Sequence, residues 1–143
     1  MYKIRLLIVE DDTATLKLYS SIIRHAFPEL LVHEATNPNA AIALFKQHHH
    51  EIILSDLKVP NRNDGIAIAR EVCHERPDTI IFLITADSST IDPGIKSNIM
   101  HLCVEGILGK PVDVRLMISV VTEAIATITL SANKDSHLQG GGD

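Results

Sequence analysis

Five short runs of aliphatic and β-branched residues alternate along this chain with segments of helical periodicity, and this alternation constrains the fold most strongly. The strand-like runs cover residues 2–9, 30–36, 52–56, 79–85 and 103–108. The central runs are apolar at consecutive positions, as in strands that are buried on both faces of a parallel sheet. We therefore predict an α/β fold, a doubly wound five-stranded parallel sheet with helices on both faces and right-handed crossovers. Alternation alone leaves the strand order open.

The intervening segments carry helix signals. Asp12 or Thr13 can cap the first helix, and Asn37-Pro38 opens the second. Residues 88–102 should also hold a helix, but the Pro93-Gly94 pair predicts that it is short, late or mobile. A last helix is expected after Pro111. Its predicted buried stripe consists of Val114, Met117, Ile118, Val121 and Ile125.

Length and composition indicate one globular domain. The chain has 143 residues, of which 45% are hydrophobic and 22% charged. We expect the domain to span residues 1–130, because the chain turns polar after Leu130. Residues 131–143 are expected to form a disordered tail, or a linker to a further domain.

Charge and apolar run lengths limit the partners. A net charge of −5 argues against direct binding of nucleic acid. No apolar stretch is expected to span a bilayer, and the start lacks a cleavage-site pattern, so we expect a cytoplasmic protein without a membrane partner. Cys73 and Cys103 lie within apolar patterns, and we expect buried thiols rather than a disulfide.

Residues suited to phosphate chemistry stand at the ends of four strand-like runs. They are Glu10, Asp11 and Asp12 after the first run, Asp56 in the third, Thr85 in the fourth and Lys110 just beyond the fifth. The carboxyl ends of parallel strands meet at one edge of a sheet, where open α/β sheets bind ligands. Carboxylates ligate Mg²⁺ and can attack phosphorus, while hydroxyl and ammonium groups bind phosphoryl oxygens. The pattern predicts a site for a divalent cation and a phosphoryl group.

In this combination the sequence resembles the receiver domains of two-component response regulators, over roughly residues 3–126. The matching segments are LLIVEDD at 6–12, SDLKVP at 55–60, Thr85-Ala86 and Lys110-Pro111. The resemblance implies a flavodoxin-like sheet in the order 2-1-3-4-5 with five flanking helices. It also implies a signalling phosphoacceptor that catalyses only its own Mg-dependent phosphorylation and dephosphorylation, rather than an enzyme with a separate substrate.

The resemblance assigns a role to each polar residue. Asp56 would accept a phosphoryl group from a phosphohistidine on a sensor histidine kinase or phosphotransfer protein. Asp11 and Asp56 would bind Mg²⁺, for which Mn²⁺ can substitute, and Glu10 would bind it through water or support the site. The backbone carbonyl of Lys58 would be a further ligand, and Lys110 would pair with the phosphoryl oxygens.

Signalling residues follow from the same resemblance. Thr85 would move toward the phosphoryl group. The switch position that is usually aromatic is Ile107 here, so we expect the signal to depend on Thr85 and on displacement of residues 86–102. Lys58 and Asp87 would lie at the mouth of the site. They would either form an ion pair that alters the lifetime of the acyl phosphate or remain two unpaired surface charges.

Two other functions fit less well. An aspartyl-phosphate hydrolase typically carries a second acid two residues after its nucleophile, where this chain has Lys58. A nucleotide-binding flavodoxin-like protein would need a phosphate-cradling loop where Glu10-Asp11-Asp12 would repel phosphate. His48-His49-His50 is not expected to bind a metal, because consecutive residues do not share a helix face.

The sequence does not determine which process the protein regulates. The chain is expected to be either a free-standing regulator or the receiver of a longer protein with an effector domain on its C-terminal side. The last helix is apolar enough to support a homodimer or docking, and it is equally compatible with core packing.

Overall fold

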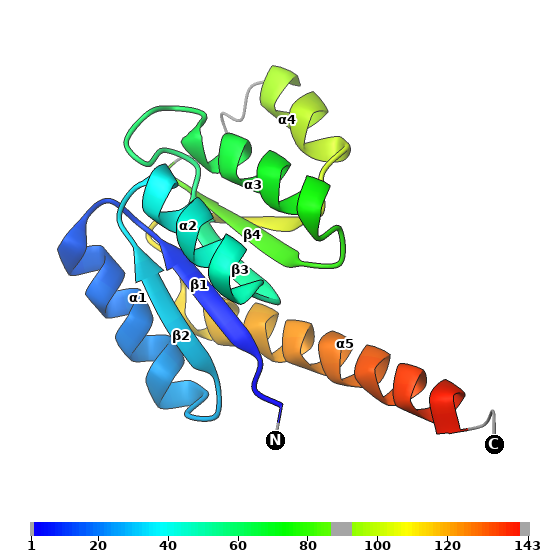
Figure 1. Cartoon of the computed structure of the whole chain (residues 1–143). Helices are drawn as coiled ribbons and strands as arrows, with labels where there is room; N and C mark the ends of the chain where they lie inside the picture. The colour runs from blue at the N-terminus through cyan, green and yellow to red at the C-terminus, as the bar shows by residue number, and fades with distance from the viewer. Residues whose placement is uncertain (1, 87–92, 141–143) are drawn as a thin grey trace.

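The predicted sheet is present in a computed structural model of the chain, which describes residues 2–86 and 93–140 (Figure 1). The strands are β1 (Arg5–Val9), β2 (Leu31–Ala35), β3 (Ile52–Asp56), β4 (Ile80–Thr85) and β5 (Val104–Gly109). The helices are α1 (Thr13–Ala26), α2 (Pro38–His48), α3 (Asp64–Glu75), α4 (Pro93–Met100) and α5 (Val114–Gly140). All strand pairs are parallel, in the order β2-β1-β3-β4-β5. The doubly wound class and the order 2-1-3-4-5 are confirmed.

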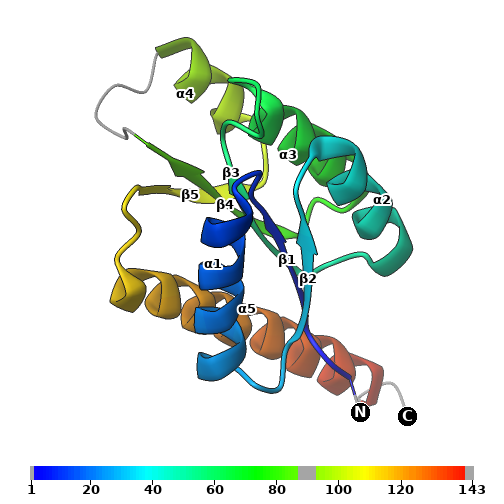
Figure 2. The same ribbon diagram turned by 90° about the vertical axis from the view of Figure 1, so that its left-hand side faces the viewer.

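Helices cover both faces of the sheet, and each face has its own core (Figure 2). On β1, Leu6 and Ile8 face α1 and α5, while Leu7 and Val9 face α2 and α3. This alternation is the period of two expected of a strand whose two faces are both buried. The near-continuous apolar run before the acids therefore places β1 in the interior of the sheet, with its polar end at the edge.

Local signals set most helix starts. The side chain of Asp12 accepts a hydrogen bond from the backbone N–H of Thr15, and that of Asn37 accepts one from Ala40, so both act as N-caps. Asp113 accepts from the backbone N–H groups of Arg115 and Leu116 before α5. Of the two candidate caps of α1, the structure uses Asp12.

The helix α4 is short and begins at Pro93, as predicted from the Pro-Gly pair. Proline is favourable in the first turn of a helix, because its missing N–H has no intrahelical partner there. Ile95 is buried, whereas Ile99 and Leu102 are only half-buried against the core. Asp87 and the rest of residues 87–92 lie outside the described residues, so the predicted Lys58–Asp87 pair is not assessed.

The helix α5 runs through residues 131–140, where we expected a disordered tail or a linker. Extending an existing helix adds one hydrogen bond per residue without a new nucleation cost, so polar residues can continue it. Figure 1 shows its C-terminal half projecting beyond the sheet. The predicted stripe is confirmed at the buried Met117 and Val121, but Val114 is 47% exposed. The division of the chain at residue 130 remains a prediction.

One expectation about apolar length was wrong. Residues Val114–Asp135 of α5 are long and apolar enough to cross a membrane by length and composition alone. One side of the helix packs on the sheet through Met117, Val121 and Ala124, and 17% of the apolar window is buried.

The expectation of two free thiols is also wrong. Cys73, in the last turn of α3, forms a disulfide with Cys103, immediately before β5. The two Cα atoms are 5.6 Å apart, within the usual range for a disulfide. The residues are 30 positions apart in sequence, and only the packing of α3 against β5 brings them together. An expectation based on a reducing cytosol cannot reveal that two residues distant in sequence are close in the fold.

Candidate functional site

The polar strand ends meet in one pocket at the carboxyl edge of the sheet, as the sequence predicted. The pocket has a volume of about 510 Å³. Its walls come from all the strand ends except β2, together with the loop after β3 and α4. The lining residues are Glu10, Asp11, Asp12, Asp56, Leu57, Lys58, Arg62, Ile84, Thr85, Ala86, Ile95 and Lys110.

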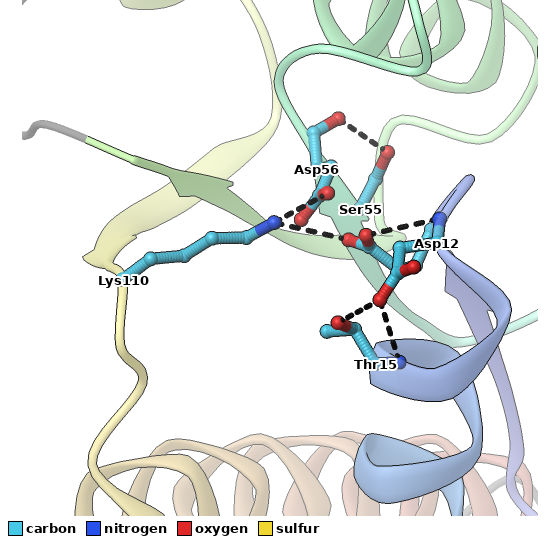
Figure 3. Close-up of polar contacts among 6 residues, drawn as sticks. Asp12, Thr15, Ser55, Asp56 and Lys110 are labelled. Carbon is cyan, nitrogen blue, oxygen red and sulfur yellow. Dashed lines mark hydrogen bonds and ion pairs between the residues drawn. The ribbon is translucent and has the colours of Figure 1, made fainter.

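Lys110 provides the counter-charge for two buried carboxylates (Figure 3). Its Nζ atom lies 2.8 Å from Oδ2 of Asp56 and 3.3 Å from Oε2 of Glu10. The Asp56 and Glu10 side chains are only 5% and 2% exposed. Burying a carboxylate without a partner is costly, so this ammonium is what makes both positions tolerable.

The position of Lys110 is fixed by backbone hydrogen bonding. The backbone N–H of Lys110 donates to the carbonyl of Thr85 at 2.8 Å, which continues the β4–β5 ladder one residue past β5. The following peptide bond, to Pro111, is cis. The hydrogen bond to Thr85 keeps Lys110 at the sheet edge, where the sequence pattern predicted it.

The three consecutive acids after β1 have three different environments. Glu10 is buried, and its Oε1 accepts from the backbone N–H of Asp12 at 3.2 Å. Asp11 is exposed at the rim of the pocket. Asp12 accepts from both the hydroxyl and the backbone N–H of Thr15, and these hydrogen bonds lower the pKa of the Asp12 carboxyl below its ordinary value. Two acids are therefore available to the site, and the third caps α1.

Glu10, Asp11 and Asp56 can bind one cation together. One carboxylate oxygen from each lies within 4.8 Å of the others, and they are the only such group of His, Cys, Asp or Glu found in residues 2–86 and 93–140. Oδ1 of Asp56 is buried and has no hydrogen-bond partner within the described part of the chain. Three carboxylates that come this close together, one of them with a buried oxygen that lacks a hydrogen-bond partner, fit a hard cation with oxygen ligands.

Sequence reasoning missed Gly65, which supports the backbone of the candidate phosphoacceptor. A Cβ atom at Gly65 would lie 2.3 Å from the carbonyl oxygen of Asp56 and 2.8 Å from the Cα of Leu57. The backbone N–H of Gly65 also donates to the carbonyl of Leu57 at 2.9 Å. Only glycine lets α3 begin this close to the end of β3. A glycine at the start of a predicted helix, where it is unfavourable, was the available signal.

The loop between β3 and α3 adds a further residue that was not predicted, Arg62. Asn61 and Asp64 exchange two hydrogen bonds across this loop, from the Asn61 N–H to Asp64 Oδ2 at 2.9 Å and from the Asp64 N–H to the Asn61 carbonyl at 3.1 Å. The loop is therefore an ordered turn, in which Arg62 contributes a cation to the lining of the pocket.

The other predicted site residues lie where the strand pattern places them. Thr85 is half-buried at the end of β4 and lines the pocket, and Lys58 is exposed at its rim. Ile107 does not line the pocket. It is half-buried on β5 and packs against the core on the α2–α3 side. The roles of these residues in switching remain predictions.

The histidines do not form a metal site in the described chain. His33 Nδ1 and His50 Nε2 are 2.8 Å apart, a hydrogen-bond distance, and the His48 ring lies beside that of His33. His49 adopts a left-handed backbone conformation, with φ of 52°, and ends α2.

Comparison with known proteins gives one family and one fold. The model of the response regulator receiver domain matches residues 6–122. The transcriptional regulatory protein CitT of Bacillus subtilis is 24% identical over 104 residues, which cover 71% of this chain and 46% of CitT. A protein-glutamate methylesterase/protein-glutamine glutaminase of Pseudomonas savastanoi is 25% identical and covers 93% of this chain and 37% of its own length. The chain spans less than half of these relatives.

Solved structures share the fold. The N-terminal domain of an uncharacterized protein from Wolinella succinogenes has a TM-score of 0.77 at 24% identity and covers 90% of this chain and 98% of its own. A CheY-like receiver domain from Methanospirillum hungatei has a TM-score of 0.76 at 21% identity, with coverages of 88% and 96%. At these identities the likeness concerns the fold alone.

Proposed function

The chain belongs to the response regulator receiver domains, and we propose that it accepts a phosphoryl group on Asp56 from a phosphohistidine of a sensor histidine kinase or phosphotransfer protein. Phosphorylation would then change a partner-binding face of the domain. The family assignment supports the signalling class, while the identity of the acceptor depends on the geometry at the carboxyl edge of the sheet.

One observation supports the choice of Asp56 over the other acids of the pocket. Lys110 Nζ lies 2.8 Å from one oxygen of Asp56, whose other oxygen is buried without a hydrogen-bond partner among the described residues. Asp12 is engaged in capping, and Glu10 holds both Lys110 and a backbone N–H. Asp56 is therefore the carboxylate with a free oxygen beside a cation, which is the arrangement that a nucleophile needs.

The donor set fits Mg²⁺, with Mn²⁺ as a substitute. Asp11, Asp56 and the backbone carbonyl of Lys58 would hold the ion, and Glu10 would bind it through water or support it. When bound, the ion would neutralise charge on the transferring phosphoryl oxygens. Without a metal ion, Glu10 and Asp56 share the ammonium of Lys110 with Asp11 close by, and the mutual repulsion of the three carboxylates would oppose the approach of any phosphate.

The chain's own residues would supply positioning and charge. Attack of an Asp56 oxygen on phosphorus forms the acyl phosphate while the bond from phosphorus to the donor nitrogen breaks. Lys110 would then exchange its contact with Asp56 for the new phosphoryl oxygens. The Thr85 hydroxyl, half-buried in the same pocket, would move to donate to one of them and draw the following segment with it. Lys58 at the rim, together with Asp87, would affect the lifetime of the acyl phosphate.

The wider setting is proposed on the same basis. A receiver domain acts in the cytoplasm, where the kinase partner presents its phosphohistidine. An effector domain on the C-terminal side, or a homodimer through α5, would carry the output. The relatives above include a transcriptional regulator and a methylesterase, so the output of this chain is not fixed by its family.

Incubation with acetyl phosphate and Mg²⁺, followed by intact-mass measurement, tests the proposal. The parent should gain the mass of one phosphoryl group, and removal of Mg²⁺ by a chelator should slow the gain by about 100-fold or more. Asp56→Asn removes the nucleophile and should show no gain. Asp12→Asn is the matched control, because it changes an acid of the same pocket while keeping a side chain that caps helices. Equal labelling of Asp56→Asn and the parent would refute the assignment.

A further inference from the structure

A second reactive group lies outside the pocket, at the disulfide between Cys73 and Cys103. We propose that this disulfide is a reversible redox site: a dithiol reductant cleaves it, and cleavage releases the segment between the two cysteines. The second half of this inference, an altered response to phosphorylation, rests on the proposed function. The first half concerns the unphosphorylated protein alone.

The positions of the two cysteines let the crosslink attach the turn after α4 to α3. Cys73 lies on α3, whose start packs on the backbone of Asp56 and Leu57 through Gly65. Cys103 lies in the turn between α4 and β5. The backbone N–H of Cys103 donates to Sγ of Cys73 at 2.9 Å, so the turn is attached to α3 by a hydrogen bond as well as by the covalent bond.

The covalent loop closed by the disulfide contains the segment that would transmit the signal. It holds β4 with Thr85, residues 86–92 and all of α4. Within the described part of this loop, α4 has weak packing, since Ile95 is its one buried residue. Figure 1 shows α4 lying beside α3, at the end of the sheet that carries the pocket. A crosslink from α3 to the residues just after α4 therefore limits how far α4 can move.

The disulfide is accessible enough to react. Both cysteines are half-buried, at the border of the core on the α2–α3 side, rather than deep within it. In a reducing compartment, disulfides of this kind are rare, and those that form are commonly transient or redox-sensing. A disulfide in a domain of the signalling class that acts there is thus more readily explained as a switch than as a permanent brace.

Cleavage proceeds by thiol–disulfide exchange. A thiolate of the dithiol attacks one of the two sulfur atoms, the S–S bond breaks, and a mixed disulfide forms with release of the other cysteine as a thiolate. The second thiol of the reagent then displaces the remaining cysteine and becomes oxidised with its neighbour. Cys73 and Cys103 each take up a proton, so the protein gains two electrons and two protons.

The experiment compares three forms of the full chain: protein treated with oxidised glutathione, the same protein reduced with dithiothreitol, and the double variant Cys73→Ser/Cys103→Ser. Intact mass and thiol titration report the redox state. Amide exchange of residues 93–104 reports the release of α4, first without ligand and then with Mg²⁺ and beryllofluoride as a phosphoryl mimic. Closing a loop of this length shifts an opening equilibrium by about tenfold or more in the chain-entropy account. We therefore expect exchange about tenfold faster after reduction.

The controls separate the redox site from the phosphoryl site. The double variant should match the reduced parent and should not respond to dithiothreitol, whereas exchange in α1 should be alike in all forms. Failure to form the disulfide, or equal exchange of residues 93–104 in oxidised and reduced protein, would overturn this inference. Loss of acetyl-phosphate labelling in every redox state, with the exchange difference intact, would instead refute the phosphoacceptor function and leave the redox site standing.

Discussion

The two ends of the sheet bury polar side chains in opposite ways. At the carboxyl edge, Asp56 and Glu10 are buried beside the cation of Lys110. At the amino edge, His50 is 0% exposed and its neighbours are cationic or imidazole groups. Burial and then these neighbours lower the pKa of His50 to about 3. The neighbours that contribute are His33 on β2, His48 and His49 at the end of α2, and Arg5 on β1.

The difference teaches how local charge decides the state of a buried group. A carboxylate with an ammonium at 2.8 Å can stay charged and reactive in the interior. An imidazole surrounded by positive or neutral groups is held neutral and serves as a hydrogen-bonded core residue. His50 Nε2 has His33 as a partner, and Nδ1 has none in the described residues. The carboxyl edge therefore holds a charged, reactive carboxylate, whereas the amino edge holds a neutral histidine that makes stability depend on pH.

The largest expected effect is a loss of stability at acidic pH, caused by His50 at the amino edge. The folded pKa of His50 is depressed from 6.5 to about 3. The unfolded chain therefore binds more protons between these two values, and stability must fall as the pH falls through that window. At about pH 4.5 the expected loss of unfolding free energy relative to neutral pH is about 2–3 kcal/mol. Urea denaturation across this range measures it.

Two variants isolate this titration from that of the carboxylates. His50→Phe keeps a ring against Phe45 but cannot be protonated, so its stability should be less sensitive to pH between about 4.5 and 6.5. His25→Asn changes an exposed histidine of α1 and should keep the parent's slope. If His50→Phe and the parent lose stability in parallel, the account of the amino edge is wrong.

Removing the cation tests the carboxyl edge. Lys110→Met leaves Asp56 and Glu10 buried without their ion pair and should cost about 2 kcal/mol of unfolding free energy. The value is below that of a fully buried pair because the Lys110 side chain is 30% exposed. Lys110→Arg keeps the charge and should lose less. Urea denaturation of the three proteins without Mg²⁺ makes the comparison, and an unaltered midpoint for Lys110→Met would show that the pair contributes nothing.

The smallest expected effect is that of substituting Asp12, and it distinguishes a role in capping α1 from a role in the phosphoryl site. Asp12→Ala removes the acceptor of the Thr15 N–H and should cost about 1 kcal/mol of unfolding free energy. Asp12→Asn should cost only a fraction of that, because asparagine also caps. Neither change should alter the extent of acetyl-phosphate labelling. Reduced labelling of both variants, at full stability, would place Asp12 among the phosphoryl-site residues rather than in the cap.

Most of the fold followed from the sequence, because its signals are local. The residues that end β1, β3 and β4 have the identities that predicted the site, and parallel pairing brings them to one edge whatever the details of packing. The caps Asp12 and Asn37 were visible because a side chain three residues from its target needs no tertiary structure. The strand order came from resemblance to a family, and the structure confirmed it.

The features that the sequence did not reveal concern residues whose partners are distant in the chain. The Cys73–Cys103 crosslink depends on how α3 sits against β5, and no composition rule records that contact. The extension of α5 through residues 131–140 depends on a helix already nucleated by packing at Met117 and Val121. Gly65 was overlooked because its importance lies in the space between α3 and the backbone of Asp56.

By itself the sequence determined the alternation of strands and helices and the set of side chains that gather at the carboxyl edge. Tertiary structure alone decided that Glu10 shares Lys110 with Asp56 while Asp11 stands at the rim. It also decided that Cys73 is joined to Cys103, and that His50 is buried and held neutral. The physical reason is the same throughout. Periodicity and capping act over a few residues, whereas burial and charge pairing depend on distances that exist only once the layers have packed.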